Sequence, residues 1–202
     1  WRDDLRDFKK LGRPRLFFGI SGGCMDSMVN KYTANKRLRS EDAYTPDGRP
    51  DMRPDYPSTV YSQILKKLFP DVPVVIGGIE ASLRRLSHYD YWQDKVQKSI
   101  LCDSGADLLI YGMGEKPLAD LVKNMKSLLT TEEPVLTSSK FRTIIGSVPQ
   151  TAYLCRATEW TSAEDDLQLY SHEECLADKK KQASNFRHIE EESNKYSASR
   201  IT

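Results

Sequence analysis

The densest group of side chains that could carry chemistry follows directly after the Gly-Gly pair in the middle of the chain. Arg84 and Arg85 could each hold a carboxylate or phosphate at two points, because the guanidinium is a planar fork that keeps its charge. His88 beside Asp90 could move a proton. The same stretch also fits an ordinary helix start in which Glu80 pairs with Arg84 four residues later. One histidine without a visible nucleophile defines no active site, so we assign no catalytic residue.

Three turns that contain glycine each follow a short apolar run and precede a predicted helix. They are Gly19-Ile20-Ser21-Gly22-Gly23, Gly77-Gly78 and Gly112-Met113-Gly114. Alternating strands and helices predict parallel strands, whose carboxyl ends share one edge of the sheet, and open α/β sheets bind ligands at that edge. The candidate rim residues are Gly22, Gly23, Gly77, Gly78, Glu80, Arg84, Arg85, His88, Gly112, Gly114 and Glu115. Glycine is also common in such turns for steric reasons alone, and that alternative stays open.

The glycine turns do not have the spacing of two familiar nucleotide-binding motifs. None of them supplies all three glycines of Gly-x-Gly-x-x-Gly, and the chain contains no Gly-Lys-Ser or Gly-Lys-Thr. The sequence therefore argues against a plain NAD enzyme and against an ATPase with a phosphate-binding loop.

The cysteines do not predict a metal site. They stand at positions 24, 102, 155 and 175, and no two have the Cys-x-x-Cys spacing of a metal or redox pair. His172 and Cys175 share a predicted helix face, but two ligands do not complete a zinc site. We expect four free thiols and no metal bound to this chain.

The pattern of apolar residues predicts an α/β fold. Short buried strands are expected at 16–20, 72–76 and 106–111, and helices at 25–33, 59–69, 79–86, 92–101 and 117–129. Shorter β-like runs at 141–148 and 151–155 suggest an edge pair, and a polar helix is expected from Ser171 to Lys195. The expected architecture is an open, mostly parallel sheet with helices on both faces and a polar helical C-terminal extension.

Residues 34–57 do not have the pattern of a helix or a strand. They contain four prolines and a Pro-Asp-Gly turn, which forbid regular structure over much of the segment. Tyr44, Met52 and Tyr56 give the segment side chains that can pack. We interpret it as a functional or packed loop rather than as disorder.

The composition is that of a soluble, globular, intracellular domain. In 202 residues, 30 Lys and Arg stand against 29 Asp and Glu, which gives no electrostatic argument for a nucleic-acid or membrane partner. No apolar run approaches the roughly 18 residues of a membrane span. The chain begins at Trp1 rather than Met, so we expect it to be part of a longer protein. The expected organisation is an exposed lead-in at 1–11, a compact domain at 12–156 and a polar helical linker at 157–202.

Several segments together resemble one known family. They are Leu16–Thr33, Arg37–Pro46, Ile76–Arg85 with His88–Trp92, and Ala106–Glu115, and residues 186–200 are similar to the approach to that family's second domain. The likeness is closest in Ile-Gly-Gly-Ile-Glu-Ala-Ser-Leu-Arg-Arg at 76–85. The family is that of the YgiQ-type radical SAM proteins, and the resemblance covers most of the chain.

The resemblance implies a cytoplasmic, bacterial protein of unassigned substrate. Its N-terminal domain would be similar to cobalamin-binding, flavodoxin-like domains, and a radical SAM domain would follow. In that second domain a Cys-x-x-x-Cys-x-x-Cys triplet holds a [4Fe-4S] cluster that cleaves S-adenosylmethionine. This chain has no such triplet, and it also lacks the Asp-x-His-x-x-Gly pattern of many cobalamin domains. The cluster and S-adenosylmethionine are therefore expected in the full-length parent only, and cobalamin binding stays open.

Two functions follow from the resemblance. In the first, the chain is an accessory domain that contributes substrate or cofactor contacts beside the downstream radical SAM domain, and is not catalytic alone. In the second, it is a non-catalytic ligand-binding or docking module. If an arginine of the pair at 84–85 faces a ligand, we expect its replacement by lysine to change stability by no more than about 0.5 kcal/mol, as at surface sites.

Overall fold

The computed structural model describes residues 4–202, which fold as two compact units. Within the described residues the first, which we name the sheet unit, comprises 4–85 and Ile100–Leu154. The second, which we name the hairpin unit, comprises Leu86–Ser99 and Cys155–Thr202. The expected lead-in falls partly on residues 1–3, outside the described residues. Just after them, helix α1 (Arg6–Lys9) places Phe8 against Tyr61, with ring centroids 5.4 Å apart.

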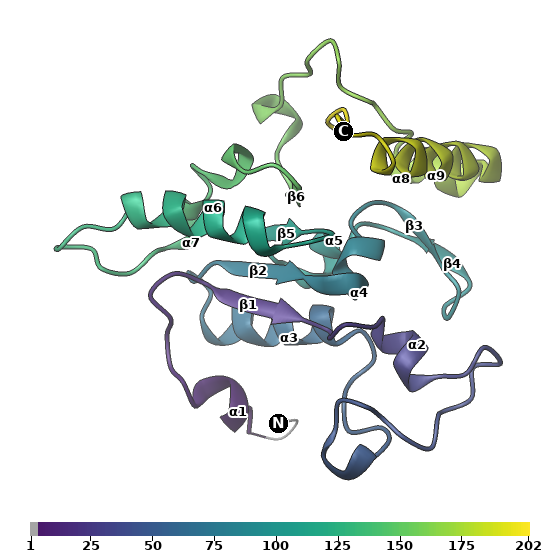
Figure 1. Ribbon diagram of the computed structural model, residues 1–202, viewed down its shortest axis with the longest axis horizontal. Helices are drawn as coiled ribbons and strands as arrows, with labels where there is room; N and C mark the ends of the chain where they lie inside the picture. Colours follow the sequence, from purple (N-terminus) through teal and green to yellow (C-terminus); the bar gives the residue numbers. More distant parts are fainter. Residues whose placement is uncertain (1–3) are drawn as a thin grey trace. The chain divides into compact units, whose positions relative to one another are not determined.

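The sheet unit contains a four-stranded sheet in the order β1-β2-β5-β6 (Figure 1). Strands β1 (Phe18–Ser21), β2 (Val74–Gly77) and β5 (Leu108–Ile110) are parallel, and β6 (Thr151–Ala152) runs antiparallel beside β5. The prediction of an α/β fold with a mostly parallel open sheet is confirmed. The Val, Ile and Leu residues of β2 and β5 are all buried, because both faces of the sheet are covered.

Helices cover both faces of the sheet. On one face α6 (Glu115–Ser127) packs its buried Leu121 and Met125 against Val75 and Leu108. On the other face Leu65 of α3 (Pro57–Leu68) joins Val74, Ile76 and Leu109 in a second cluster. Neighbouring residues of one strand thus enter opposite clusters, as the two-residue period of a β-strand requires. The core of the protein lies in these two clusters.

The remaining elements of the sheet unit are short. They are α2 (Ser27–Lys31), η1 (Pro46–Gly48), α4 (Gly78–Leu83), α5 (Ile100–Ser104), α7 (Ser138–Phe141) and η2 (Ile145–Ser147). The predicted β-like run at 141–148 is wrong, because this segment forms the end of α7 and η2. Its apolar residues Phe141, Ile145 and Val148 are spaced three and four apart, and all three are buried in the α6 cluster.

The hairpin unit consists of strands β3 (His88–Asp90) and β4 (Lys95–Gln97), η3 (Ala157–Glu159), and helices α8 (His172–Ala177) and α9 (Lys179–Ser193). The predicted helix at 92–101 is wrong. Asp94 adopts a left-handed conformation with φ 54°, and the Asp90 carboxylate accepts a 2.9 Å hydrogen bond from the Gln93 N–H. These two features turn the chain back, so that β4 pairs with β3 in antiparallel register.

The predicted polar helix from Ser171 to Lys195 is interrupted once. At Asp178 the backbone leaves the helical region, and the Asp178 side chain accepts from the Lys180 N–H at 2.8 Å. One carboxylate thus ends α8 and caps α9. No helix within residues 4–202 is long and apolar enough to cross a membrane.

Candidate functional site

The carboxyl ends of the three parallel strands form one rim, as the glycine turns predict. The last residues of β1 and β2 are register partners, Ser21 beside Gly77. A side-chain carbon on Gly77 would lie only 3.2 Å from the carbonyl oxygen of Ile110, the last residue of β5. Gly112 N–H reaches across to the Ser82 hydroxyl of α4 at 3.3 Å. The rim is therefore a continuous surface built from three segments.

The glycines of the rim accommodate the protein's own side chains. Gly23 has φ +109°, and a Cβ there would lie 2.7 Å from the ring of Tyr44. Gly78 has φ +83°, and a Cβ there would lie 2.6 Å from the Ser21 hydroxyl. Both positions need glycine for backbone conformation and for close approach. This packing is the steric explanation of the glycines, and ligand binding at the rim stays a prediction.

Glu80 is a fully buried carboxylate that caps a helix from another segment. Its Oε1 accepts from the backbone N–H of Ser58 at 2.9 Å, in the first turn of α3, where the N-cap residue Tyr56 offers no side-chain bond. Its Oε2 has no hydrogen-bond partner among residues 4–202. A Cβ on Gly22 would lie 2.9 Å from that oxygen, so the first rim glycine makes room for this carboxylate.

Arg84 is 9% exposed and forms an ion pair with Asp26, which is 6% exposed. Asp26 is also the N-cap of α2, since its Oδ1 accepts from the N–H groups of Met28 and Val29 at 3.0 and 3.2 Å. The guanidinium also donates to the Glu80 carbonyl oxygen at 3.3 Å. The Glu80 carboxylate and Arg84 thus have different partners, and each fixes the start of a helix. Arg84 is buried and paired, so it is not a surface site. Replacing it by lysine should therefore change the free energy of unfolding by more than the limit of about 0.5 kcal/mol that the sequence suggested.

Arg85 and His88 occupy different surroundings. The Arg85 guanidinium donates to the Ser82 carbonyl oxygen at 2.7 Å and lies 5.0 Å from the centre of the Tyr111 ring, just after β5. It is the candidate arginine that stands at the rim. His88 belongs to the hairpin unit, where its Nδ1 lies 3.0 Å from the Leu86 carbonyl oxygen. Exposed Glu115 begins α6 behind the third glycine turn.

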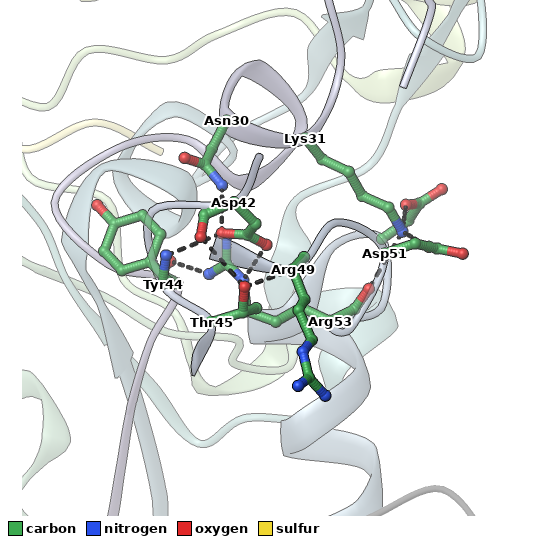
Figure 2. Close-up of polar contacts among 10 residues, drawn as sticks. Asn30, Lys31, Asp42, Tyr44, Thr45, Arg49, Asp51 and Arg53 are labelled. Carbon is green, nitrogen blue, oxygen red and sulfur yellow. Dashed lines mark hydrogen bonds and ion pairs between the residues drawn. The ribbon is translucent and has the colours of Figure 1, made fainter. Parts of the chain in front are cut away.

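The loop at 34–57 is held by a buried aspartate that the sequence did not single out. The Asp42 carboxylate accepts from Asn30 at 2.8 Å, from Arg53 at 3.1 and 3.2 Å, and from the N–H of Tyr44 at 2.9 Å. Figure 2 shows these side chains gathered around Asp42. Burial alone would raise the pKa of Asp42, but these donors together hold it below its ordinary value. The only local signal was a short polar run before Tyr-Thr-Pro, which suits an Asx turn.

The same loop is attached to the rim. Arg53 donates to the carbonyl oxygen of Gly22 at 3.1 Å and lies 4.5 Å from the centre of the Tyr44 ring. The Tyr44 hydroxyl lies 2.9 Å from the thiol of exposed Cys24, and this contact raises the pKa of Tyr44. The loop side chains thereby contact Gly22 and Cys24, in the turn that follows β1.

A second ion-pair group secures the far end of the loop. The Lys31 side chain, only 8% exposed, pairs with Asp51 and Asp55 at 2.8 Å each and donates to the Arg53 carbonyl oxygen at 3.1 Å. Burial lowers the pKa of Lys31, but the two carboxylates outweigh it and raise the pKa above its ordinary value. The structure therefore confirms the packed-loop interpretation of residues 34–57.

The residues present do not fit an iron–sulfur cluster. Cys24, Cys102, Cys155 and Cys175 are free thiols, and no three His, Cys, Asp or Glu side chains among residues 4–202 gather as metal ligands. A [4Fe-4S] cluster needs three or four neighbouring thiolates. The four thiols of this chain therefore do not make up the ligand set of such a cluster.

These features define an α/β domain in which a packed polar loop contacts the turn after the first of the parallel strands. Over residues 1–202 the sequence matches the family described as Radical SAM N-terminal, and the chain belongs to that family. A UPF0313 protein from Bacteroides thetaiotaomicron is 83% identical over 202 residues, which are 100% of this chain and 33% of the relative. A UPF0313 protein from Porphyromonas gingivalis is 64% identical over 201 residues, again 100% of this chain and 30% of the relative.

More distant relatives match only part of the chain. A UPF0313 protein from Methanocella arvoryzae is 54% identical over 124 residues, or 61% of this chain and 21% of the relative. No solved structure matches the chain, so the likeness to cobalamin-binding domains stays a prediction. The chain spans about a third of the length of the first two relatives, and it is a domain of a larger radical SAM protein.

Proposed function

We propose that this chain is the accessory domain of a radical SAM enzyme and that its rim contributes substrate or cofactor contacts. The observation that carries the proposal is the pair of buried contacts at the rim. The Glu80 carboxylate binds the start of α3, and Arg84 binds the Asp26 carboxylate at the start of α2. A preformed rim of this kind positions groups without reorganisation when a ligand arrives. The cluster and S-adenosylmethionine would be held elsewhere in the parent, where they would supply the radical that starts the reaction.

The residues of this chain that we propose to contact a ligand are those of the rim that reach its surface. Arg85, half-buried over Tyr111, presents a charged fork beside the third strand end. The exposed thiol of Cys24 lies beside the first strand end, against Tyr44. These side chains would bind and orient an anionic or polar group. The cytoplasmic location belongs to this proposal and follows from the family resemblance.

A second function is favoured by the filled glycine positions. Because Tyr44, Ser21 and Glu80 occupy the space beside Gly23, Gly78 and Gly22, the rim would serve as a rigid scaffold for an interface. The chain would then be a non-catalytic docking module. In that case cobalamin or nucleotide would not bind at the glycine turns.

One experiment separates the two functions. The full-length parent is reconstituted with iron and sulfide, and formation of 5′-deoxyadenosine from S-adenosylmethionine is measured for the native protein and for Arg85→Lys and Cys24→Ser variants. An accessory rim predicts at least a tenfold loss in Arg85→Lys with an unchanged melting temperature. Lys126→Arg, on the exposed side of α6, is the control. Full activity in both rim variants favours the docking module, and a native parent that cleaves no S-adenosylmethionine refutes the enzyme assignment.

A further inference from the structure

The hairpin unit has almost no apolar interior. Its buried residues are Asp90, Cys175, Asn185 and Glu192, and both hydrophobic clusters found among residues 4–202 lie in the sheet unit. Several of its large apolar side chains are exposed, including Leu176 at 57% and Phe186 at 62%, and others such as Leu167 and Ile189 are only half-buried. A unit of this size without a hydrophobic core does not gain enough from burial to offset its chain entropy.

Polar contacts give the hairpin unit a defined geometry. Asn185 of α9 accepts from the Tyr170 N–H at 2.9 Å and donates to the Tyr170 carbonyl oxygen at 2.9 Å and to the Cys175 sulfur at 3.2 Å. Glu192 accepts from the Ser199 N–H at 2.8 Å. Such bonds specify one arrangement but contribute little net stability, because each replaces a bond to water.

The charges of α9 oppose its helix dipole. Three lysines, 179–181, stand at its positive end and three glutamates, 190–192, at its negative end, with no acid in the first turn and no base in the last. Lys181 is paired with Glu174 at 2.7 Å and Arg187 with Glu191 at 3.7 Å. Asp178 caps the start of α9 and Glu192 pairs with Lys195, but Lys179 and Glu190 form no ion pair among residues 4–202. An arrangement that breaks a local rule and leaves these two charges uncompensated points to a partner that supplies the opposite charges.

One face of α9 exposes a positive charge near its start, a negative charge near its end and an apolar ring between them. Lys179, Ala183, Phe186 and Glu190 follow one another at spacings of four, three and four residues, and all four are exposed. Residues at this spacing form a single stripe along a helix. The stripe offers a phenyl ring between a positive charge at the start of the helix and a negative charge near its end.

We infer that this stripe of α9 docks against the remaining part of the parent polypeptide. The inference rests on the proposed function, in which this chain is one domain of a longer enzyme. Relatives three times as long supply an occupant in the same polypeptide, where even a small contact forms because the effective concentration is high. The matching surface carries an apolar pocket for Phe186, with an acidic group facing Lys179 and a basic group facing Glu190. Docking in this register compensates both charges and covers the exposed ring.

Hydroxyl-radical footprinting of the full-length parent tests the inference. We expect the Phe186 ring to be modified at least fivefold more slowly than the fully exposed Tyr196 ring, after correction for intrinsic reactivity. Reversal of both charges, Lys179→Glu with Glu190→Lys, should restore fast modification of Phe186. The matched control reverses two exposed charges of the sheet unit, Lys126→Glu with Glu132→Lys, and should leave Phe186 protected.

Three results would overturn the docking. They are fast modification of Phe186 in the native parent, equal protection in the charge-reversed variant, and protection that disappears on dilution, which would assign the stripe to a second copy of the chain. Cleavage of S-adenosylmethionine is measured on the same samples. A parent that cleaves it while Phe186 is exposed refutes the docking alone, and a protected Phe186 in a parent that cleaves nothing refutes the enzyme assignment alone.

Discussion

The sheet unit and the hairpin unit are ordered by different interactions. In the sheet unit, clusters of fully buried aliphatic and aromatic residues cover both faces of a parallel sheet, and buried ion pairs lie at its rim. In the hairpin unit, buried polar side chains connect α8, α9 and the segment before them, and the large apolar side chains are half-buried or exposed. Burial of apolar area supplies most folding free energy, so stability should be distributed unevenly along the chain.

The two units also differ in how their candidate binding surfaces are built. The rim of the sheet unit is completed by contacts within this chain, since Asp26, Glu80 and Asp42 each join two segments. The stripe on α9 instead has an exposed Phe186 ring, and its charged residues Lys179 and Glu190 form no ion pair among residues 4–202. We propose the first surface for a small ligand and the second for a macromolecular partner.

The largest expected effect comes from removing a phenyl ring in each unit. Phe141 is fully buried in the α6 cluster, and Phe141→Ala should lower the free energy of unfolding by about 3–5 kcal/mol. Phe186 is 62% exposed, and Phe186→Ala should change the free energy of unfolding by no more than about 0.5 kcal/mol. Urea unfolding of the 202-residue chain measures both. Equal losses would remove the distinction between the units.

Breaking the buried ion pair of the rim should have the next largest effect. Asp26→Ala leaves the Arg84 charge buried without its partner and uncaps α2, and we expect a loss of about 3 kcal/mol. Arg84→Lys keeps the charge but loses the planar fork, and we expect about 1–2 kcal/mol. A double-mutant cycle with Asp26→Ala and Arg84→Met measures the coupling. Additive losses would contradict the claim that this pair organises the rim.

Acidification should release the hairpin unit before the sheet unit. The pKa of Asp42 is lowered despite its burial, and Lys195 and the Ser199 N–H lower the pKa of Glu192. Each carboxylate therefore stabilises the fold above its unfolded pKa of about 4, and that contribution is lost as the pH falls through the lower folded value. When the carboxylates of Asp42 and Glu192 are both protonated, only the sheet unit still has a hydrophobic core, so the hairpin unit should unfold first.

Amide exchange at pH 5, 4 and 3 follows the two units separately. As the pH falls, the α9 amides should lose protection first. Glu192→Gln should weaken the pH dependence of α9 protection, and Asp42→Asn should leave that pH dependence unchanged. Simultaneous loss in both units would indicate a single cooperative structure.

The smallest effect concerns the charges of α9. In the 202-residue chain, Lys179→Glu and Glu190→Lys should each stabilise α9 by about 0.3–1 kcal/mol, because they align its charges with the helix dipole. The same changes should weaken docking in the full-length parent. Helix content by circular dichroism and footprinting of Phe186 measure the two effects. A change that lowers helix content would contradict the assignment of these charges to a partner.

The strands and the shared rim could be predicted because apolar runs that end in glycine turns are local signals. Residues 74–76 and 108–110 are buried and apolar, and each run leads into such a turn. The role of Asp42 could not be predicted, since its partners Asn30 and Arg53 lie 12 and 11 residues away and meet only in the folded loop.

The errors also have local physical causes. In 92–101, Trp92, Val96 and Ile100 have helical spacing, but the turn at Asp94 pairs the segment with 88–90 instead. The four-residue spacing of Glu80 and Arg84 suggests a pair within one helix, whereas in the structure each side chain contacts the start of another helix. Contacts between distant segments leave no periodic signal in the sequence.

The central claim is that only the sheet unit is stabilised by its own core, and native-state hydrogen exchange of the 202-residue chain tests it most directly. Amides of β2 and β5 should exchange only by global unfolding. Amides of α9 should exchange at least about 100-fold faster, through local opening of the hairpin unit. The same α9 amides should become protected in the full-length parent. Equal protection of α9 and β2 in the 202-residue chain would contradict the account.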